Sequence, residues 1–243
     1  MTIAVDAGNT FVKVAVFQSG TMVECEKFRK AFFFEKISGL LKRYRGITDM
    51  VVASVSDIDE DALHALKVKV RVHVLDGCSR LPFENLYTTP KTLGADRIAL
   101  MAAACKVYPG KNTLVIDSGT CITYDFLDAR NRYLGGAISP GIRMRYRALH
   151  SFTARLPLLD IMELDDFIGD STATSMASGV LNGVVNEIDG VIGQYRERFQ
   201  NLTVILTGGD LDFLSEQLKS SIFANPNFLL EGLNYILELN KNP

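Results

Sequence analysis

The chain has 243 residues and a formal net charge of −2 at pH 7. This length suffices for one large core or two compact domains, and the lack of a basic stripe argues against a nucleic-acid partner. No apolar stretch is long enough to span a bilayer, the first residues lack the pattern of a signal peptide, and the four cysteines form no CxxC pair. We therefore expect a cytoplasmic protein with reduced cysteines, no membrane partner and no structural zinc site.

The first hundred residues alternate between strand and helix patterns. Short apolar runs predict strands at residues 3–5, 11–17, 21–28, 50–55 and 68–75, and helical spacing predicts helices at 31–45 and 59–66, with Asp57 as a candidate N-cap. Residues 77–93 contain glycines and prolines and predict a long ordered loop. A further helix at 98–107 places Asp96 in its first turn, where the helix dipole favours an ionised carboxylate.

A small polar loop joins the first two strands. Gly8 and Asn9 tolerate the positive φ of a tight hairpin, and Thr10 and Lys13 add a hydroxyl and an ammonium group beside exposed backbone N–H groups. Such donors suit phosphate oxygens, and Asp6 at the end of the first strand suits a metal ion on that phosphate. An ordinary turn with a surface lysine explains the same residues, so this loop alone leaves both interpretations open.

A similar order of elements follows residue 110. Strands are predicted at 113–116, 122–126, 133–138 and 203–206, and helices at 142–149, from 171 or 172 to 199, from 211 and at 228–239. The long helix is interrupted by four glycines that would weaken it in isolation, so we expect another helix or backbone to approach it closely at Gly179, Gly183, Gly190 and Gly193.

The polar loop also returns in the second half. Asp117-x-Gly119-Thr120 stands where Asp6-x-Gly8-x-Thr10 stands in the first half, at the end of the first strand of a three-stranded meander. A repeated meander with the same loop is much harder to attribute to turn chemistry than a single loop. We therefore predict two domains, 1–109 and 110–243, with Asp6 and Asp117 facing one cleft.

This duplicated order of elements resembles the acetate and sugar kinase, heat-shock ATPase and actin superfamily. Each half there is an RNase H-like domain, and the nucleotide lies in the cleft between the halves. The resemblance implies an α/β fold of duplicated RNase H-like, actin-like ATPase domains, each with a mixed five-stranded sheet and helices. The turn at Thr207-Gly208-Gly209 is similar to the adenosine-binding turn of that superfamily.

Four motifs narrow the resemblance to type III pantothenate kinase, over essentially the whole chain. In order, they are Asp6-x-Gly8-Asn9-Thr10-x-x-Lys13, Tyr87-x-x-Pro90-x-x-Leu93-Gly94-x-Asp96-Arg97, Asp117-x-Gly119-Thr120-x-x-Thr123 and Gly135-Gly136-x-Ile138-x-Pro140-Gly141. The chain departs from the family pattern only slightly. Ala7 stands where a larger apolar residue is usual, and Cys121 stands where a small residue such as alanine is common.

The resemblance implies roles for matching residues. ATP phosphates with Mg²⁺ would be bound by the first loop and by a threonine of the second, namely Asp6, Ala7, Gly8, Asn9, Thr10, Phe11, Val12, Lys13 and Thr120. Pantothenate would be contacted by Tyr87, Gly94, Ala95, Asp96, Arg97 and Thr172. Asp96 would be the general base, Asp6 would hold Mg²⁺ through the phosphates, and Asp117 would hold a monovalent cation, potassium or ammonium.

The implied activity is ATP-dependent phosphorylation of pantothenate to 4′-phosphopantothenate, the first step of coenzyme A biosynthesis, by a homodimer that binds pantothenate near its subunit interface. Two alternatives stay open at this point. One is a kinase of the same superfamily that acts on a sugar or an acyl acid, which the 87–97 block disfavours. The other is a nucleotide-binding regulatory protein without catalysis, which the intact Asp6, Asp96 and Asp117 disfavour.

Overall fold

The structure is a computed structural model that describes residues 1–8, 11–53 and 60–241. It divides into two compact units. The first comprises Met1–Gly110, Arg130–Leu134 and Asn227–Pro243, and the second comprises Lys111–Ala129 and Gly135–Pro226. The division into domains at residues 109 and 110 stays a prediction, and the last helix of the chain belongs to the first compact unit.

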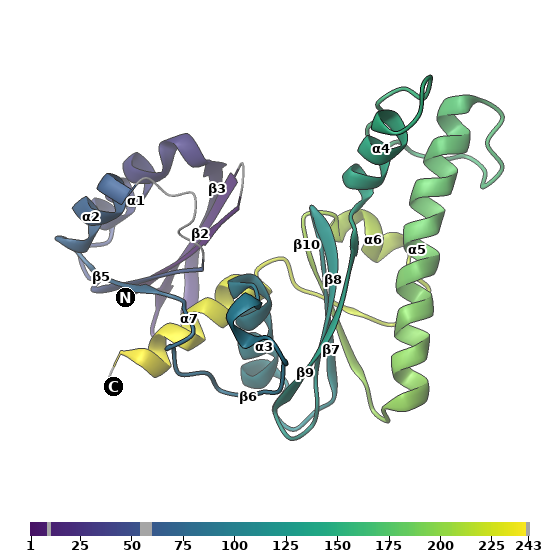
Figure 1. Ribbon diagram of the computed structural model, residues 1–243. Helices are drawn as coiled ribbons and strands as arrows, with labels where there is room; N and C mark the ends of the chain where they lie inside the picture. The colour runs from purple at the N-terminus through teal and green to yellow at the C-terminus, as the bar shows by residue number, and fades with distance from the viewer. Residues whose placement is uncertain (9–10, 54–59, 242–243) are drawn as a thin grey trace. The chain divides into compact units, whose positions relative to one another are not determined.

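The first unit is built on a mixed five-stranded sheet (Figure 1). Its strands are β1 (Thr2–Ala7), β2 (Phe11–Gln18), β3 (Thr21–Arg29), β4 (Asp49–Val52) and β5 (Arg71–Val74), in the order β3-β2-β1-β4-β5. The hairpin strands β1, β2 and β3 pair antiparallel, whereas β4 and β5 add parallel strands after helical crossovers. All five strands confirm the prediction, although β5 begins later than expected because residues 68–70 form a turn that caps the preceding helix.

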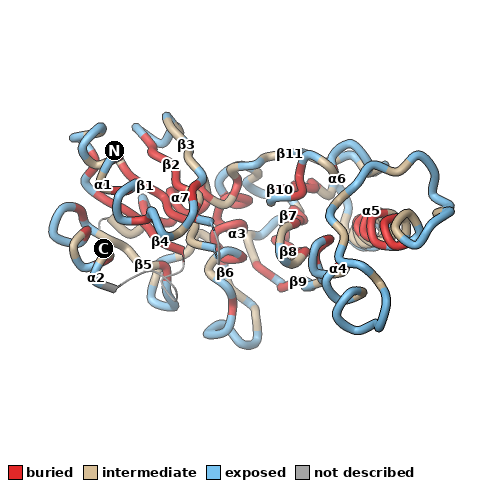
Figure 2. The backbone as a smooth tube through the Cα atoms, turned by 90° about the horizontal axis from the view of Figure 1, so that it is seen from above, coloured by how far each residue is buried: buried red, intermediate tan, exposed pale blue. Residues whose placement is uncertain are grey.

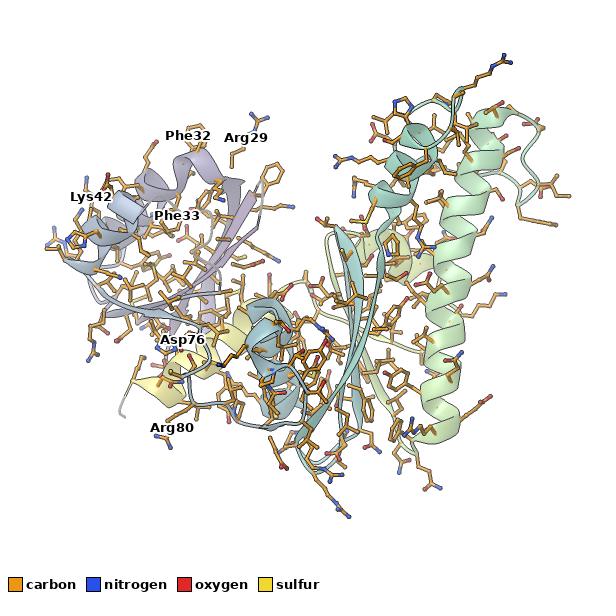
Figure 3. The ribbon with its side chains drawn as sticks, viewed as in Figure 1. Arg29, Phe32, Phe33, Lys42, Asp76 and Arg80 are labelled. Carbon is orange, nitrogen blue, oxygen red and sulfur yellow. The ribbon has the colours of Figure 1, made fainter. Side chains whose placement is uncertain are left out.

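Two helices cover one face of this sheet. α1 (Phe33–Arg43) and α2 (Glu60–Lys67) pack Ile37, Leu40 and Leu66 against the strand residues that point to their side. Figure 3 labels the start of α1, where Phe33 is buried and the preceding Phe32 is 49% exposed. β1 is buried on both faces, because the strand period of two sends Ile3 and Ala4 to opposite faces and both are fully buried. The candidate N-cap Asp57 lies outside the described residues.

The last helix, α7 (Phe228–Asn240), packs on β1 and beside α3 (Ala95–Val107) within the first unit. The two helices come so close that a methyl group at Gly232 would overlap the carbonyl oxygen of Ala99. A buried hydrogen bond of 2.6 Å from Thr2 Oγ1 to Asn234 Oδ1 joins α7 to β1. The helix predicted at 228–239 is therefore confirmed, and it contributes core to the unit formed by the beginning of the chain.

The second unit repeats the strand order of the first. Its strands are β7 (Thr113–Ser118), β8 (Cys121–Leu127), β9 (Arg132–Pro140), β10 (Thr203–Gly208) and β11 (Phe223–Ala224), and they lie in the order β9-β8-β7-β10-β11. The sheet has six strands instead of the predicted five, because the short strand β6 (Glu84–Asn85) pairs with the first residues of β9, which belong to the first unit. β7 pairs antiparallel with β8 and parallel with β10, as β1 does with β2 and β4. This correspondence confirms the predicted duplication. The short strand β11 was missed because two residues carry no detectable alternation.

Three helices complete the second unit, namely α4 (Ile142–Ser151), α5 (Thr172–Arg198) and α6 (Leu211–Gln217). α5 begins as predicted, with Ser171 as N-cap in a capping box with Thr174, and it packs one side on the core of this unit. The exposed segment between α4 and α5 is pale blue in Figure 2.

The expectation of close approach along α5 is wrong within the chain. A Cβ atom added at any of its four glycines would meet no atom within 4 Å in the described structure.

In the part of the chain that the structure describes, no helix combines the length and apolarity needed to cross a membrane.

Candidate active site

The turn between β1 and β2 carries the first predicted motif. Asp6 and Lys13 are paired in the register of the two strands, and the Gly8 N–H donates to the Phe11 carbonyl at 3.0 Å. The Val12 side chain is fully buried in the core, so a ligand would reach this residue only through its backbone. Two further predicted ligands of this turn, Asn9 and Thr10, lie outside the described residues.

Asp6 lies near a second acidic residue. Burial and the negative charge of Asp96 raise the pKa of Asp6 from 3.8 to about 6, while the positive charge of Lys13 works in the opposite direction. The structure thus brings Asp6, Lys13 and Asp96 within electrostatic reach of one another. Two neighbouring carboxylates repel each other unless a proton or a cation lies between them.

These carboxylates fit the predicted Mg²⁺. Among residues 1–8, 11–53 and 60–241, no group of three His, Cys, Asp or Glu side chains gathers to hold a metal by itself. Mg²⁺ is commonly held by one or two carboxylates, with phosphate and water oxygens as the other ligands. Asp6, with Asp96 nearby, provides the acidic part of such a site, and bound nucleotide would provide the rest.

Changing Asp6 to Asn is expected to make the protein more stable at pH 7.5. Because the pKa of Asp6 is about 6 in the folded chain and 3.8 as a free group, its contribution to stability is fully present below pH 3.8 and is lost as the pH rises through 6. The variant should exceed the parent by on the order of 1–2 kcal/mol at pH 7.5 and match it near pH 3.5. Urea unfolding at both pH values measures this.

Glu35→Gln, which neutralises an exposed carboxylate on α1, is the matched control and should change little. An Asp6→Asn protein no more stable than its parent at pH 7.5 would contradict the electrostatic link between Asp6 and Asp96.

Asp96 lies exposed in the first turn of α3, as predicted. Its Oδ1 atom accepts a hydrogen bond of 2.8 Å from the backbone N–H of Arg97. A methyl group on Gly94 would overlap this same oxygen, so a larger residue there would displace the Asp96 carboxylate from its present position. The following Ala95 is the first residue of α3, and its small side chain adds little bulk beside the carboxylate.

Arg97 contacts aromatic rings in the first unit. It is only 5% exposed, so it is not a solvated surface arginine. Its Cζ atom lies 5.4 Å from the ring centroid of Tyr87 and 6.0 Å from that of Tyr133. Two predicted substrate residues, Tyr87 and Arg97, therefore both contact Tyr133, a residue that was not predicted to belong to the site.

In the second unit, Asp117 is the last residue but one of β7. It is paired in register with Thr123 on β8 and with Thr207 on β10, so the three side chains share one face of the sheet. Thr123 Oγ1 is buried and makes no hydrogen bond within the described part of the chain. Gly208 adopts φ 104°, and a methyl group there would overlap Ser118 O and Asp117 Oδ1. An oxygen-lined site of this kind fits a monovalent cation.

The last predicted motif packs against the loop that carries Thr120. The Gly141 N–H donates to the Thr120 carbonyl at 3.2 Å, and a methyl group on Gly141 would overlap the carbonyl oxygens of Gly119 and Thr120. Thr120 itself is exposed and available to a ligand. Thr172, also exposed, is the first residue of α5.

The sequence of this chain is similar to that of a known protein family. Residues 2–194 match the family described as type III pantothenate kinase. The chain belongs to this family. A type III pantothenate kinase of Christiangramia forsetii is 52% identical over 241 residues, which cover 99% of both chains. Another, from Flavobacterium johnsoniae, is 50% identical over 234 residues and 96% of both chains.

Solved structures with the same fold are more distant in sequence. A Campylobacter jejuni protein assigned to the Baf family of transcriptional activators has a TM-score of 0.63 at 21% identity, with 99% of this chain and 100% of that chain covered. A glucokinase from an Antarctic psychrotroph has a TM-score of 0.54 at 12% identity, with 98% and 99% covered. Both show that this chain shares its fold with these proteins, and a shared fold does not by itself assign a function.

One charged cluster beside the Asp117 motif was not predicted. The buried Asp210 carboxylate accepts a hydrogen bond of 2.8 Å from Arg143 and one of 3.4 Å from Ser118 Oγ, while the Asp210 N–H donates to the Ser118 carbonyl at 3.1 Å. These contacts hold the turn after β10 against the end of β7. Asp210 directly follows the two glycines of that turn, and this position could have marked it as a candidate site residue. Nothing near Arg143 in the sequence indicates a partner 67 residues away.

Proposed function

We propose that this chain transfers the terminal phosphoryl group of ATP to the primary hydroxyl of pantothenate, giving 4′-phosphopantothenate in the first step of coenzyme A biosynthesis, in the cytoplasm. Membership of the type III pantothenate kinase family supports the substrate. The structural observation that carries the proposal is the proximity of Asp96, the candidate base, to Asp6 and Lys13 of the turn that would bind phosphate.

The residues of the first unit suit the acceptor side of this reaction. Asp96 accepts the proton of the attacking hydroxyl, and a carboxylate is a sufficient base when that proton leaves late in a loose transition state. Lys13 and the backbone N–H groups of the β1–β2 turn neutralise charge on the transferred phosphoryl group. Mg²⁺ bound near Asp6 would add further neutralisation.

Arg97 supplies a cation for the carboxylate of pantothenate, and Tyr87 supplies an apolar face for its chain. In this proposal, Gly94, Ala95 and Thr172 complete the pantothenate site. The close fit of Gly94 against Asp96 supports the first of these assignments.

The residues of the second unit suit the nucleotide. Thr120 donates a hydroxyl to ATP, and the turn at Gly208 and Gly209 admits the flat adenosine moiety close to the backbone. Asp117 would hold potassium or ammonium, whose positive charge would help to neutralise the phosphates of ATP. The buried Thr123 Oγ1 on the same face of the sheet supports this cation site, because an unpaired buried hydroxyl oxygen is a suitable ligand for such an ion.

We further propose that the chain works as a homodimer formed through the second unit. The segment between α4 and α5 exposes large apolar side chains, with Phe152 88% and Phe167 73% exposed, and the glycines of α5 leave open space for a second helix. Large exposed apolar patches commonly mark interfaces. Light scattering should give twice the mass of one chain, and a monomer at micromolar concentration would contradict this interface.

The experiment that tests the function is ADP release measured with a panel of acceptors. Pantothenate should release ADP, whereas glucose, N-acetylmannosamine and acetate should not, and turnover should be faster in potassium or ammonium buffer than in sodium. ADP release with a sugar would favour another kinase of the superfamily, and no release with any acceptor would favour a regulatory protein. Equal turnover in the three buffers would remove the cation from Asp117.

A further inference from the structure

We propose that Tyr133, at the start of β9, is a positioning residue for the pantothenate site: its ring holds Tyr87 and Arg97 in the arrangement that binds substrate. The inference rests on the proposed function. It concerns a residue that lies outside all of the predicted binding motifs and makes no proposed contact with substrate.

The ring of Tyr133 packs against the side chains of Tyr87, Arg97 and Phe83. Tyr133 is fully buried, and its ring stacks on that of Tyr87 with centroids 5.9 Å apart and planes inclined by 21°. The guanidinium of Arg97 lies within 6.0 Å of both ring centroids. Phe83 closes the group by meeting Tyr133 edge-on at 6.1 Å. Tyr133 therefore contacts all three of the other residues of this group.

The backbone of Tyr133 also contacts the segment that carries Tyr87. The predicted loop at 77–93 contains a short strand, β6 (Glu84–Asn85), which pairs parallel with the first residues of β9. The Leu86 N–H donates to the Tyr133 carbonyl at 3.1 Å, and Asn85 Oδ1 accepts a hydrogen bond of 3.0 Å from the Tyr87 N–H. The backbone of Tyr133 thus fixes the segment that carries Tyr87, and its ring fixes the Tyr87 side chain.

These contacts have a clear consequence for Arg97. A guanidinium that lies over aromatic faces at low exposure is attracted by their quadrupoles and loses little rotamer freedom when it binds a carboxylate. Removing the Tyr133 ring would leave Tyr87 without its stacking partner and Arg97 with one aromatic face instead of two. Pantothenate binding would then include the entropy cost of ordering both side chains.

The test is steady-state kinetics on Tyr133→Leu. The KM for pantothenate should rise by about tenfold, on the scale of a lost cation–π contact and its ordering, while the KM for ATP and kcat stay within about twofold. Tyr133→Phe keeps the ring and should restore the parent KM. Phe83→Leu is the matched control, because it removes a buried ring that meets Tyr133 edge-on and leaves the stacked rings of Tyr133 and Tyr87 in place.

Three results would overturn the inference. They are an unchanged KM for pantothenate in Tyr133→Leu, an equal rise of both KM values, or the same rise in Phe83→Leu. If Tyr133→Leu does not fold, Tyr133→Met, which keeps apolar volume without a planar face, should show the same selective rise. If the parent protein itself shows no turnover of pantothenate, the proposed function fails, whereas an active parent with an unaffected variant refutes the role of Tyr133 alone.

Discussion

Changing Asp96 to Asn should lower kcat for pantothenate by on the order of a hundredfold or more, the usual effect of removing a general base. Asn keeps the shape of the side chain and removes the proton acceptor. The melting temperature should change little, because the loss of a favourable charge in the first turn of α3, worth about 0.3–1 kcal/mol, is offset in part by removing a negative charge near Asp6. Binding of ATP should survive, since the residues proposed to contact the nucleotide are unchanged.

The same variant carries an internal control. The negative charge of Asp96 is one cause of the raised pKa of Asp6, so its removal should return that pKa toward 3.8 and shift the pH dependence of stability to lower pH. If Asp96 served only to cap α3, the variant would keep near-normal turnover. That outcome would remove Asp96 from the mechanism even if the pKa of Asp6 moved as expected.

Changing Gly208 to Ala should have the second-largest effect, and it should act on both stability and activity. Gly208 adopts φ 104°, where a side chain is strained, and an added methyl group would overlap Ser118 O and Asp117 Oδ1. We expect a loss of about 2–4 kcal/mol in the free energy of unfolding, typical of strain combined with a backbone clash. Since the clash falls on Asp117, potassium should no longer stimulate the residual activity.

The adjacent residue provides the matched control. A Cβ atom added at Gly209 meets no atom within 4 Å in the described structure, so Gly209→Ala should fold with nearly the parent's stability. Urea unfolding of the two variants side by side makes the comparison. Equal losses would show that the turn needs glycine for general flexibility, and would contradict a specific fit between Gly208 and Asp117.

Much of the fold could be predicted from local patterns. The strands that form each meander are short apolar runs bounded by turn residues, and the repeated polar loops at Asp6 and Asp117 predict the duplication that the two strand orders confirm. The first turn of α3 could also be predicted from the sequence, because Gly94 and the acidic Asp96 precede a clear helical run. These features depend on residues close together in the sequence.

Contacts between distant residues could not be predicted in the same way. The chain enters the second unit and then returns, so α7 packs in the first unit although nothing in its own residues indicates a partner more than a hundred positions earlier. The burial of Arg97 depends on rings from two other segments, Tyr87 and Tyr133. The pairing of Asp210 with Arg143 is of the same kind. Pattern and propensity describe single elements, whereas these contacts depend on how the elements pack.

The central claim is phosphoryl transfer from ATP to pantothenate, and identification of the product tests it most directly. The protein should be incubated with ATP, Mg²⁺, potassium and pantothenate, and the mixture analysed by phosphorus NMR and mass spectrometry. We predict one new phosphomonoester on the primary hydroxyl of pantothenate, formed in equal amount with ADP and at an initial rate about a hundredfold or more lower with Asp96→Asn. ADP formed with free phosphate and no phosphopantothenate, or no ADP at all, would contradict the account.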